Sequence, residues 1–353
     1  MDLLNYPEPV RLRIFSHFNS SELFFLSFCS TATREEVKKV IAHRKPECVA
    51  DIMIKNELRG MRFVISSEGA PCCWRLSLDL PAGMKSHGKR FDLTIDGTVY
   101  HCCAGWSAAM GTAEIFLTKD SQKKTIPTFL CQYLTTLTAQ PLEFFMLADV
   151  EFIQELPTLM NCVSTYTLFV DGESVKLADI YNLEKNWVTP ESCEFEPLIV
   201  GQPRNQLKLV SCVKNLRVGK SSWLKRGHLM WFKGSTLFLL NSRLTAIDII
   251  EFVKKWMKDP TPPPLEAILI GFAPHHQFDY MKILETFKPR AFDPSRRSAN
   301  FVIKARFRCE TFRSIDATDG MDIERPDKLL ASFYRSPSRF MFLVWHNRFP
   351  KEE

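Results

Sequence analysis

Two pairs of adjacent cysteines, Cys72-Cys73 and Cys102-Cys103, are the residues whose types most suggest chemistry, and His101 directly precedes the second pair. Thiolates and imidazoles bind zinc when three or four of them converge. Adjacent residues of a strand point to opposite faces, however, so each pair supplies one thiol to a shared site. A site made of His101, Cys103 and one cysteine of the first pair is the metal-binding alternative. The expected role of these thiols is that of small, buried hydrophobic side chains.

The sequence holds no arrangement typical of an enzyme. A glycine-rich phosphate loop, a G-x-S-x-G nucleophile elbow and an H-E-x-x-H zinc helix are all absent from it. His275 and His276 stand in a predicted loop, where we expect both to be solvated. No cysteine is marked as a nucleophile by its neighbours. We therefore predict no catalytic residue, no bound metal and no cofactor.

A basic strand face between residues 300 and 309 is the segment with the clearest binding character. In NFVIKARFRC, alternation places Phe301 and the other apolar residues on one side, and Lys304, Arg306 and Arg308 on the other. The simplest interpretation is a solvated strand face. The alternative is a substrate-binding platform, because arginine side chains pair well with the carboxylates or phosphates of an acidic segment in a captured protein.

Composition excludes several classes of protein before any element is placed. The 353 residues are 45% hydrophobic and 24% charged, as in ordinary globular proteins, so disorder is not expected. The formal net charge of +6 is too small to argue for nucleic acid by itself. No apolar run approaches the ~18 residues of a membrane span, and charged residues interrupt the N-terminus where a signal peptide would be apolar. With eleven cysteines, we expect an intracellular protein of the cytoplasm, the nucleus or both, with reduced thiols and no membrane partner.

The elements that must position these residues change in kind along the chain. From about Met61 the alternation of apolar and polar residues predicts strands, and the Asp-Gly of residues 96–97 predicts a tight hairpin turn. Farther on, strand-like and helix-like segments alternate, with strands beginning at Leu216, Leu237 and Leu265. Because their spacing is too uneven for uniform leucine-rich repeats, we predict irregular, repeat-like strand–helix units whose helices pack on a sheet.

The clearest helix is predicted over Thr245–Lys258. Thr245 and Asp248 have the spacing of a capping box, the lysines near its end suit the negative pole of the helix dipole, and Pro260 terminates it. Its buried stripe is predicted to consist of apolar side chains at helical spacing: Ile247, Ile250, Val253, Trp256 and Met257.

The N-terminal segment predicts three short helices between residues 7 and 43. Val10, Ile14 and Phe18 share one face of the first helix, whereas the second helix, Leu23–Cys29, is apolar on nearly every side. So many large apolar side chains in a segment of this size indicate that it packs against another surface.

The third of these helices is predicted to start at a capping box of Thr33 and Glu36 and to bury Val37, Val40 and Ile41. About forty residues cannot bury the apolar side chains of all three helices among themselves. The surplus surface must contact either the rest of this chain or another protein. Burying each large side chain contributes about 1.5–3 kcal/mol in either case, so energetics alone does not choose between them.

This opening stretch resembles an F-box. The resemblance rests on Leu4, the Tyr6-Pro7 pair, the aliphatic spacing of Val10 and Ile14, and the sequence SSELFFLSFCS that follows. F-boxes bind a Skp-type adaptor, which bridges to a cullin scaffold. The alternative is an internal helical hairpin. The resemblance implies that the adaptor is contacted by Leu4, Pro7, Val10, Ile14, Phe18, Leu23 and Leu26.

Residues 235–272 and 320–347 resemble the F-box-associated domain, type two. That family has an LT-x-x-D helix start, an F-x-K-x-W helix, an LE-x-x-x-I strand and closing hairpins. In the hairpins, the family's usual glycine after an aspartate is Lys328 here. The matching residues are Leu244, Thr245, Asp248, Phe252, Lys254, Trp256, Leu265, Glu266 and Ile270, followed by Asp322, Ile323, Arg325, Asp327, Ala331, Phe340, Val344 and Trp345.

These expectations combine into one fold and one function. The predicted fold class is α+β, with a three-helix F-box at 1–45, an intermediate mixed α/β region at 46–200, and an F-box-associated domain with C-terminal β-hairpins at 201–353. The resemblance implies a non-catalytic substrate receptor of a Skp–cullin–F-box ubiquitin ligase, with a Skp-type adaptor, a cullin held through it, and an unknown target protein as partners. One alternative is an interaction module that uses the adaptor without a cullin. The other is a nucleic-acid-binding module built on the basic strand, whose affinity would fall steeply with salt.

Overall fold

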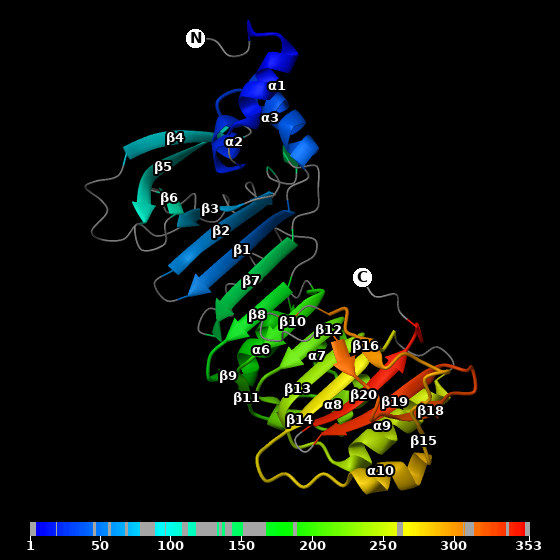
Figure 1. Cartoon of the computed structure of the whole chain (residues 1–353). Helices are drawn as coiled ribbons and strands as arrows, with labels where there is room; N and C mark the ends of the chain where they lie inside the picture. The colour runs from blue at the N-terminus through cyan, green and yellow to red at the C-terminus, as the bar shows by residue number, and fades with distance from the viewer. Residues whose placement is uncertain are drawn as a thin grey trace. The chain divides into compact units, whose positions relative to one another are not determined.

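A computed structural model gives the fold of the chain as two compact units, Met1–Tyr166 and Thr167–Glu353, which are described in turn (Figure 1). Both contain helices and strands, which confirms the α+β class at that level of detail. The residues that the structure describes are 5–18, 20–44, 47–55, 58–67, 70–77, 89–95, 97–107, 112–117, 133, 136–137, 143–150, 167–185, 189–259, 264–305, 307, 314–336 and 339–349.

Three helices open the first unit: α1 (Glu8–Ser16), α2 (Ser20–Leu26) and α3 (Thr31–Arg44). The expected number and order are therefore confirmed, but α3 starts earlier than predicted. The hydroxyl of Ser30 accepts the Thr33 backbone N–H at 3.0 Å, so Ser30 is the capping residue. The predicted capping box of Thr33 and Glu36 is wrong, because both residues lie inside the helix and Glu36 is engaged elsewhere.

Hydrogen-bonded strands follow these helices in the first unit, in the order β7-β1-β2-β3-β6-β5-β4. The predicted Asp-Gly hairpin joins β4 to β5, and Gly97 has the positive φ of 80° that such a turn requires. Helix α2 contacts β2 and β3, so part of its apolar surface meets the sheet of its own unit. The strands are β1 (Glu47–Lys55), β2 (Leu58–Ser67), β3 (Ala70–Ser77), β4 (Lys89–Ile95), β5 (Thr98–Ser107), β6 (Thr112–Leu117) and β7 (Glu143–Asp149).

The second unit begins with five parallel strands in the order β8-β10-β12-β13-β14, connected by short helices. Neighbouring parallel strands need such crossover connections. Strands that are covered on both faces have sequences that are apolar almost throughout. A small parallel pair, β9 (Ser174–Lys176) with β11 (Leu198–Val200), lies within the connections. The five strands are β8 (Thr167–Asp171), β10 (Ser192–Phe195), β12 (Asn215–Val218), β13 (Thr236–Ser242) and β14 (Ala267–Phe272), and the intervening helices are α6 (Leu177–Lys185), α7 (Lys208–Ser211), η4 (Ser221–Trp223), α8 (Arg226–Trp231) and α9 (Ala246–Lys258).

Antiparallel strands complete this sheet in the order β14-β20-β19-β18-β15. They form the closing hairpins that the sequence predicts. Before them come the helix α10 (Tyr280–Phe287) and a separate two-stranded hairpin, β16 with β17. The remaining strands are β15 (Arg290–Ala291), β16 (Asn300–Val302), β17 (Ser314–Asp316), β18 (Met321–Glu324), β19 (Leu330–Ser336) and β20 (Arg339–Trp345).

Both faces of the second sheet are covered. On one face, Leu269 and Leu343 belong to a cluster with residues of the β16–β17 region such as Phe301 and Ile315. On the other face, the ring of Trp256 from α9 meets Phe342 edge-on at 5.1 Å. The strand period of two thus sends alternate residues of β14 and β20 into two separate apolar layers.

Helix α9 begins as predicted, because Thr245 and Asp248 form a capping box in which each side chain bonds the backbone N–H of the other. The predicted buried stripe is only partly correct. Ile250, Val253 and Trp256 are buried, but Ile247 is 48% exposed. The buried side of the helix also includes Ala246, Ile249 and Phe252, which the prediction did not contain.

The observed division of the chain differs from the expected segments. The expected intermediate region ended at residue 200, whereas β8, β10 and the helix between them belong to the second unit, which begins at Thr167. The reason is hydrogen bonding, since β10 pairs in parallel with both β8 and β12. The basic strand is also shorter than predicted, because β16 ends at Val302.

One residue in the closing hairpins adopts a backbone conformation that favours glycine. Lys328 has a φ of 73°, and its N–H donates to the Arg325 carbonyl in the turn between β18 and β19. A left-handed conformation costs an L-residue roughly 1–2 kcal/mol, which glycine avoids at a smaller entropic cost. We expect Lys328→Gly to raise the free energy of unfolding by about 0.5–1 kcal/mol in urea titrations. Lys328→Ala, which keeps the strain, is the control and should bring no gain; an equal gain would contradict this account.

Candidate protein-interaction surfaces

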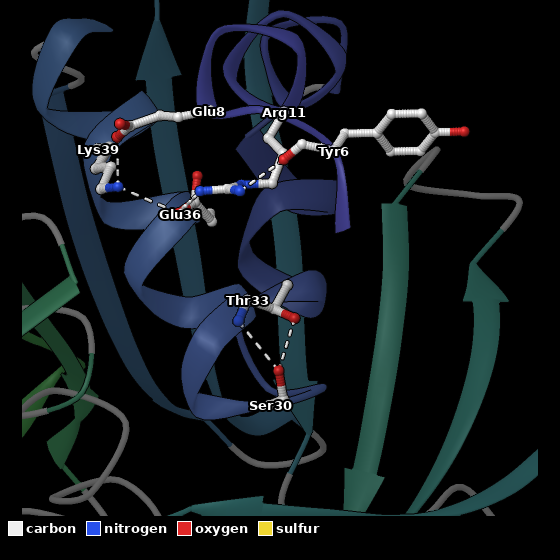
Figure 2. A network of polar contacts seen from close by, with 7 residues as sticks. All are labelled: Tyr6, Glu8, Arg11, Ser30, Thr33, Glu36 and Lys39. Carbon is white, nitrogen blue, oxygen red and sulfur yellow. Dashed lines mark hydrogen bonds and ion pairs between the residues drawn. The ribbon is translucent and has the colours of Figure 1, made fainter. Parts of the chain in front are cut away.

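A network of charged side chains joins α1 to α3 (Figure 2). Arg11 donates to the Tyr6 carbonyl at 2.7 Å and to the Glu36 carboxylate at 3.1 Å. Lys39 binds both Glu36, at 3.2 Å, and Glu8, at 2.6 Å. Because Glu36 is buried between these cations, the network fixes how α1 lies on α3, and therefore which side of α1 faces outward.

The same network makes the packing of α1 on α3 sensitive to acid. The hydrogen bond from Arg11, helped by Lys39, lowers the pKa of Glu36 below its ordinary value. A lowered pKa means that the carboxylate stabilises the fold above its unfolded-state pKa of about 4.3 and loses that contribution as pH falls through the folded-state value.

We expect Glu36→Gln to lower the free energy of unfolding at pH 7 by about 1 kcal/mol, because it weakens charge-assisted hydrogen bonds. The difference from wild type should shrink as the pH falls below the unfolded-state pKa of about 4.3, because the unfolded carboxylate takes up a proton before the folded one does. Chemical unfolding followed by circular dichroism at pH 7, 5 and 3.5 measures this. A difference that stays constant over that range would show that the Glu36 charge does not stabilise the packing.

The inner faces of the three helices are filled by their own unit. The predicted stripe of α3, Val37, Val40 and Ile41, is buried as expected. The ring of Phe24 on α2 is completely buried. Just after this helix, Phe28 stacks on Tyr133, with 4.4 Å between the ring centres. The hydroxyl of Tyr133 also donates to the Ser27 carbonyl at 2.9 Å. Much of the apolar surplus in α2 is therefore covered by the chain itself.

Some apolar surface of the N-terminal helices stays exposed on what we call the outer α1 ridge (Pro7, Val10 and Ile14). These residues lie three and four positions apart and so share one side of the helix. Val10 is 42% exposed, Pro7 is exposed, and Ile14 is half-buried. An aliphatic ridge of this kind is a surface on which a partner protein can bury apolar area.

The other residues implied in adaptor binding have different surroundings. Phe18 and Leu26 are half-buried. Leu23 is 0% exposed and is part of the core of the first unit, so its side chain offers no surface to a partner. Leu4 lies outside the described residues. The structure therefore brings Pro7, Val10 and Ile14 together on one surface and separates Leu23 from them.

The basic strand keeps the predicted alternation but shows less of a free cationic face. Phe301, Ile303 and Phe307 are buried, while Lys304 is exposed and pairs with Glu266 at 3.3 Å. Arg306 and Arg308 lie outside the described residues. Their role as a substrate-binding platform remains a prediction.

Arg297, which precedes that strand, is a structural residue. Its side chain is completely buried and donates to both carboxylate oxygens of Asp322 at 2.9 and 3.0 Å. Asp322 also accepts the Ser332 hydroxyl at 2.6 Å, and Ser332 accepts the indole N–H of Trp345 at 2.7 Å. The guanidinium further donates to the Ala317 carbonyl. This buried network connects the loop before β16 to three strands.

Arg325 forms a second buried network at the end of α9. Its guanidinium donates to the carbonyls of Trp256 and Asp259, groups that a helix C-terminus leaves without intrahelical partners, and lies 4.9 Å from the Trp256 ring centre. Several residues that carry the second sequence resemblance, including Asp322, Arg325 and Trp345, thus hold the fold together.

Cys102, Cys103 and His276, three of the cysteine and histidine candidates, are buried or hydrogen-bonded within their own units. Cys102 and Cys103 are both buried, and desolvation raises the pKa of Cys102 to about 12, which keeps that thiol protonated. His101 pairs with Asp92 at 2.8 Å, and the side chains of Cys72 and Cys73 lie outside the description. His276 is hydrogen-bonded to the Leu244 carbonyl at 2.9 Å, so the prediction of two solvated histidines is wrong for it.

A cleft in the second unit was not predicted from the sequence. It has a volume of about 400 Å³ and lies between the end of α8 and the second half of α9. No local pattern marks it, because its walls come from separate elements; the only signal is that α8 carries consecutive large apolar residues where a short helix can bury only one side. The described lining residues are Met230, Phe232, Lys233, Phe252, Lys255, Trp256, Asp259 and Pro264.

The described residues offer neither a membrane-spanning helix nor a cluster of metal ligands. No described helix is long and apolar enough to cross a membrane. Within the same residues, no group of three or more histidine, cysteine, aspartate or glutamate side chains is placed to hold a metal ion.

Two proteins of Caenorhabditis elegans are similar in sequence to this chain. Uncharacterized protein F59B2.8 is 26% identical over 173 residues, which cover 48% of this chain and 37% of that protein. Uncharacterized protein F59B2.9 is 21% identical over 366 residues, which cover 100% of this chain and 80% of that protein. The matched part is thus little more than a third of the first relative's length. No family model and no solved structure matches the chain.

Proposed function

We propose that this protein is a non-catalytic substrate receptor of a Skp–cullin–F-box ubiquitin ligase. In this proposal the three N-terminal helices are an F-box that binds a Skp-type adaptor. The second unit contains irregular, leucine-rich-repeat-like strand–helix units and the F-box-associated domain of residues 201–353. It binds a target protein in the cytoplasm, the nucleus or both. The receptor acts by proximity, because a bound target has a high effective concentration near the ubiquitin-conjugating enzyme.

The outer α1 ridge is the observation that carries this proposal. Its residues, Pro7, Val10 and Ile14, are among those that the F-box resemblance assigns to adaptor contact, and Val10 retains 42% of its exposure after the unit has folded. The charge network of Arg11, Glu36 and Lys39 holds α1 on α3, and Val10 stays exposed in this packing. A preformed apolar ridge lowers the entropic cost of binding a partner.

Co-purification of the full chain with a Skp-type adaptor and a cullin from cells tests the proposal. Recovery of both partners in amounts comparable to the chain would support the receptor function. Recovery of the adaptor without a cullin would favour an interaction module outside a ligase. If folded protein, verified by circular dichroism, recovers no adaptor, the helices serve only their own unit and the proposal fails.

A further inference from the structure

The cleft between α8 and α9 has the features of a binding site for a segment of another protein. Its floor contains Phe252 and Trp256, which are 6% and 3% exposed, and Met230 and Phe232 from the end of α8 line its other side. Clefts of about 300–1,000 Å³ with mostly apolar walls are the size class in which proteins bind ligand groups, and 400 Å³ falls within that class.

A buried hydrogen-bond donor of one lining residue has no acceptor among the described residues. Trp256 lines the cleft, and its indole Nε1 is buried without an acceptor among the residues that the structure describes. A buried donor left unpaired costs about 1–3 kcal/mol, so buried indoles usually find a partner. Because the Nε1 atom is closed off from solvent, it does not by itself select a ligand for the cleft.

The positive charge of two lysines at the rim of the cleft favours an acidic partner segment. Lys233 and Lys255 are exposed and line the cleft, against one described carboxylate, that of Asp259. The ammonium group of Lys255 also donates to the Met230 carbonyl, which places this cation where α8 meets α9. The Arg325 guanidinium behind the Trp256 ring does not add to this charge, because it is buried and paired with Asp327 at 3.2 Å. Cations around an apolar floor complement carboxylates that flank an apolar side chain.

We propose that this cleft binds a linear segment of a partner protein in which a large apolar residue is flanked by aspartate or glutamate. The apolar side chain enters between Met230 and Phe252, and the carboxylates pair with Lys233 and Lys255. This inference rests on the proposed function and deepens it, since it names a substrate-binding surface besides the basic strand and the class of sequence that it recognises.

The first test is a selection of displayed random 16-residue peptides on the immobilised full chain. Enriched sequences should contain a leucine, isoleucine, methionine or aromatic residue beside two or more acidic residues. Enriched peptides should then be synthesised with a fluorescent label and titrated with wild-type and variant chains. No enrichment, or enrichment of basic peptides, would overturn the inference.

Lys255→Glu and Lys233→Glu should each weaken peptide binding at least tenfold, because each places a carboxylate beside those of the peptide. Lys254→Glu is the matched control. Lys254 lies next to Lys255 on the same helix, but it pairs with Glu251 and does not line the cleft. The affinity of the Lys254→Glu chain for the peptide should therefore stay within twofold of wild type. Lys233 is a second site in case the loss of the Lys255 bond to α8 disturbs folding. Equal affinities of the wild-type, Lys233→Glu and Lys255→Glu chains would overturn the inference.

Adaptor recovery from the same preparations separates this inference from the proposed function. If the chain recovers the adaptor but fails both peptide tests, the receptor proposal stands and the cleft is not its substrate site. If acidic-apolar peptides bind with the expected lysine dependence and no adaptor is recovered, the cleft is a peptide-binding site and the receptor proposal fails.

Discussion

Replacing Val10 with aspartate is expected to reduce recovery of a Skp-type adaptor at least tenfold without unfolding the protein. Val10 is 42% exposed, so the substitution removes little internal packing. It also lies in the first turn of α1, Glu8–Ser16, where the helix dipole favours a negative charge. In the proposed complex, the same position becomes buried, and an unpaired carboxylate there costs several kcal/mol.

Ala32→Asp is the matched control for this experiment. Ala32 is also an exposed apolar residue in the first turn of a helix, α3, but it is not among the residues implied in adaptor contact. Its recovery of adaptor should equal that of the wild type, measured by quantitative immunoblotting at equal receptor input. If Val10→Asp and Ala32→Asp both bind the adaptor normally, the outer α1 ridge is not the docking surface.

Leu23→Asp is unsuitable as a probe of the interface. Its side chain is 0% exposed within the first unit, so a buried charge there is expected to destabilise the fold itself. Loss of adaptor binding in that variant would follow from unfolding even if Leu23 never met a partner. Only residues that remain exposed in the folded chain distinguish an interface from a core.

Replacing Arg297 with methionine should lower the free energy of unfolding of the second unit by about 3–5 kcal/mol, because it leaves the buried Asp322 carboxylate without its cation. Both side chains of this pair are at most 1% exposed. Urea unfolding followed by tryptophan fluorescence measures the loss, since the Trp345 indole bonds Ser332 in the same network. Asp322→Asn should have a similar effect.

Arg296→Met is the control, one residue away. Arg296 pairs with Glu324 at 2.8 Å, but both side chains are more than a fifth exposed, and such pairs contribute about 0–1 kcal/mol. The double variant Arg297→Met with Asp322→Leu should lose less than the sum of the single losses, because it removes both charges together. Additive losses would mean that the two residues do not stabilise each other.

Features that depend on a few neighbouring residues were predictable from the sequence. The capping box of Thr245 and Asp248 and the glycine turn at Gly97 occur as expected. The alternation from Phe301 to Phe307 also holds, although β16 is shorter than predicted. These features follow from hydrogen bonds and side-chain periods within one element, so local sequence contains the necessary information.

The candidate site was only partly predictable, because exposure depends on distant segments. Val10 and Leu23 are both aliphatic residues of short N-terminal helices, yet one is exposed and the other is completely buried. Where α2 meets Tyr133 and the strands β2 and β3, the packing is set by residues far away in the sequence. No period within a seven-residue helix specifies which of its sides will meet a sheet.

The sequence by itself determined the kinds of elements in this protein: three short N-terminal helices, then strands, then strand–helix alternation with closing hairpins. The tertiary structure decided which polar and apolar groups are used internally. It buries Arg297 against Asp322, places Arg325 on the end of α9, and assembles the cleft from α8 and α9. Helices, strands and turns arise from the backbone and from residues close in sequence. Side chains become buried or paired in the interior only when elements distant in sequence pack together and exclude water.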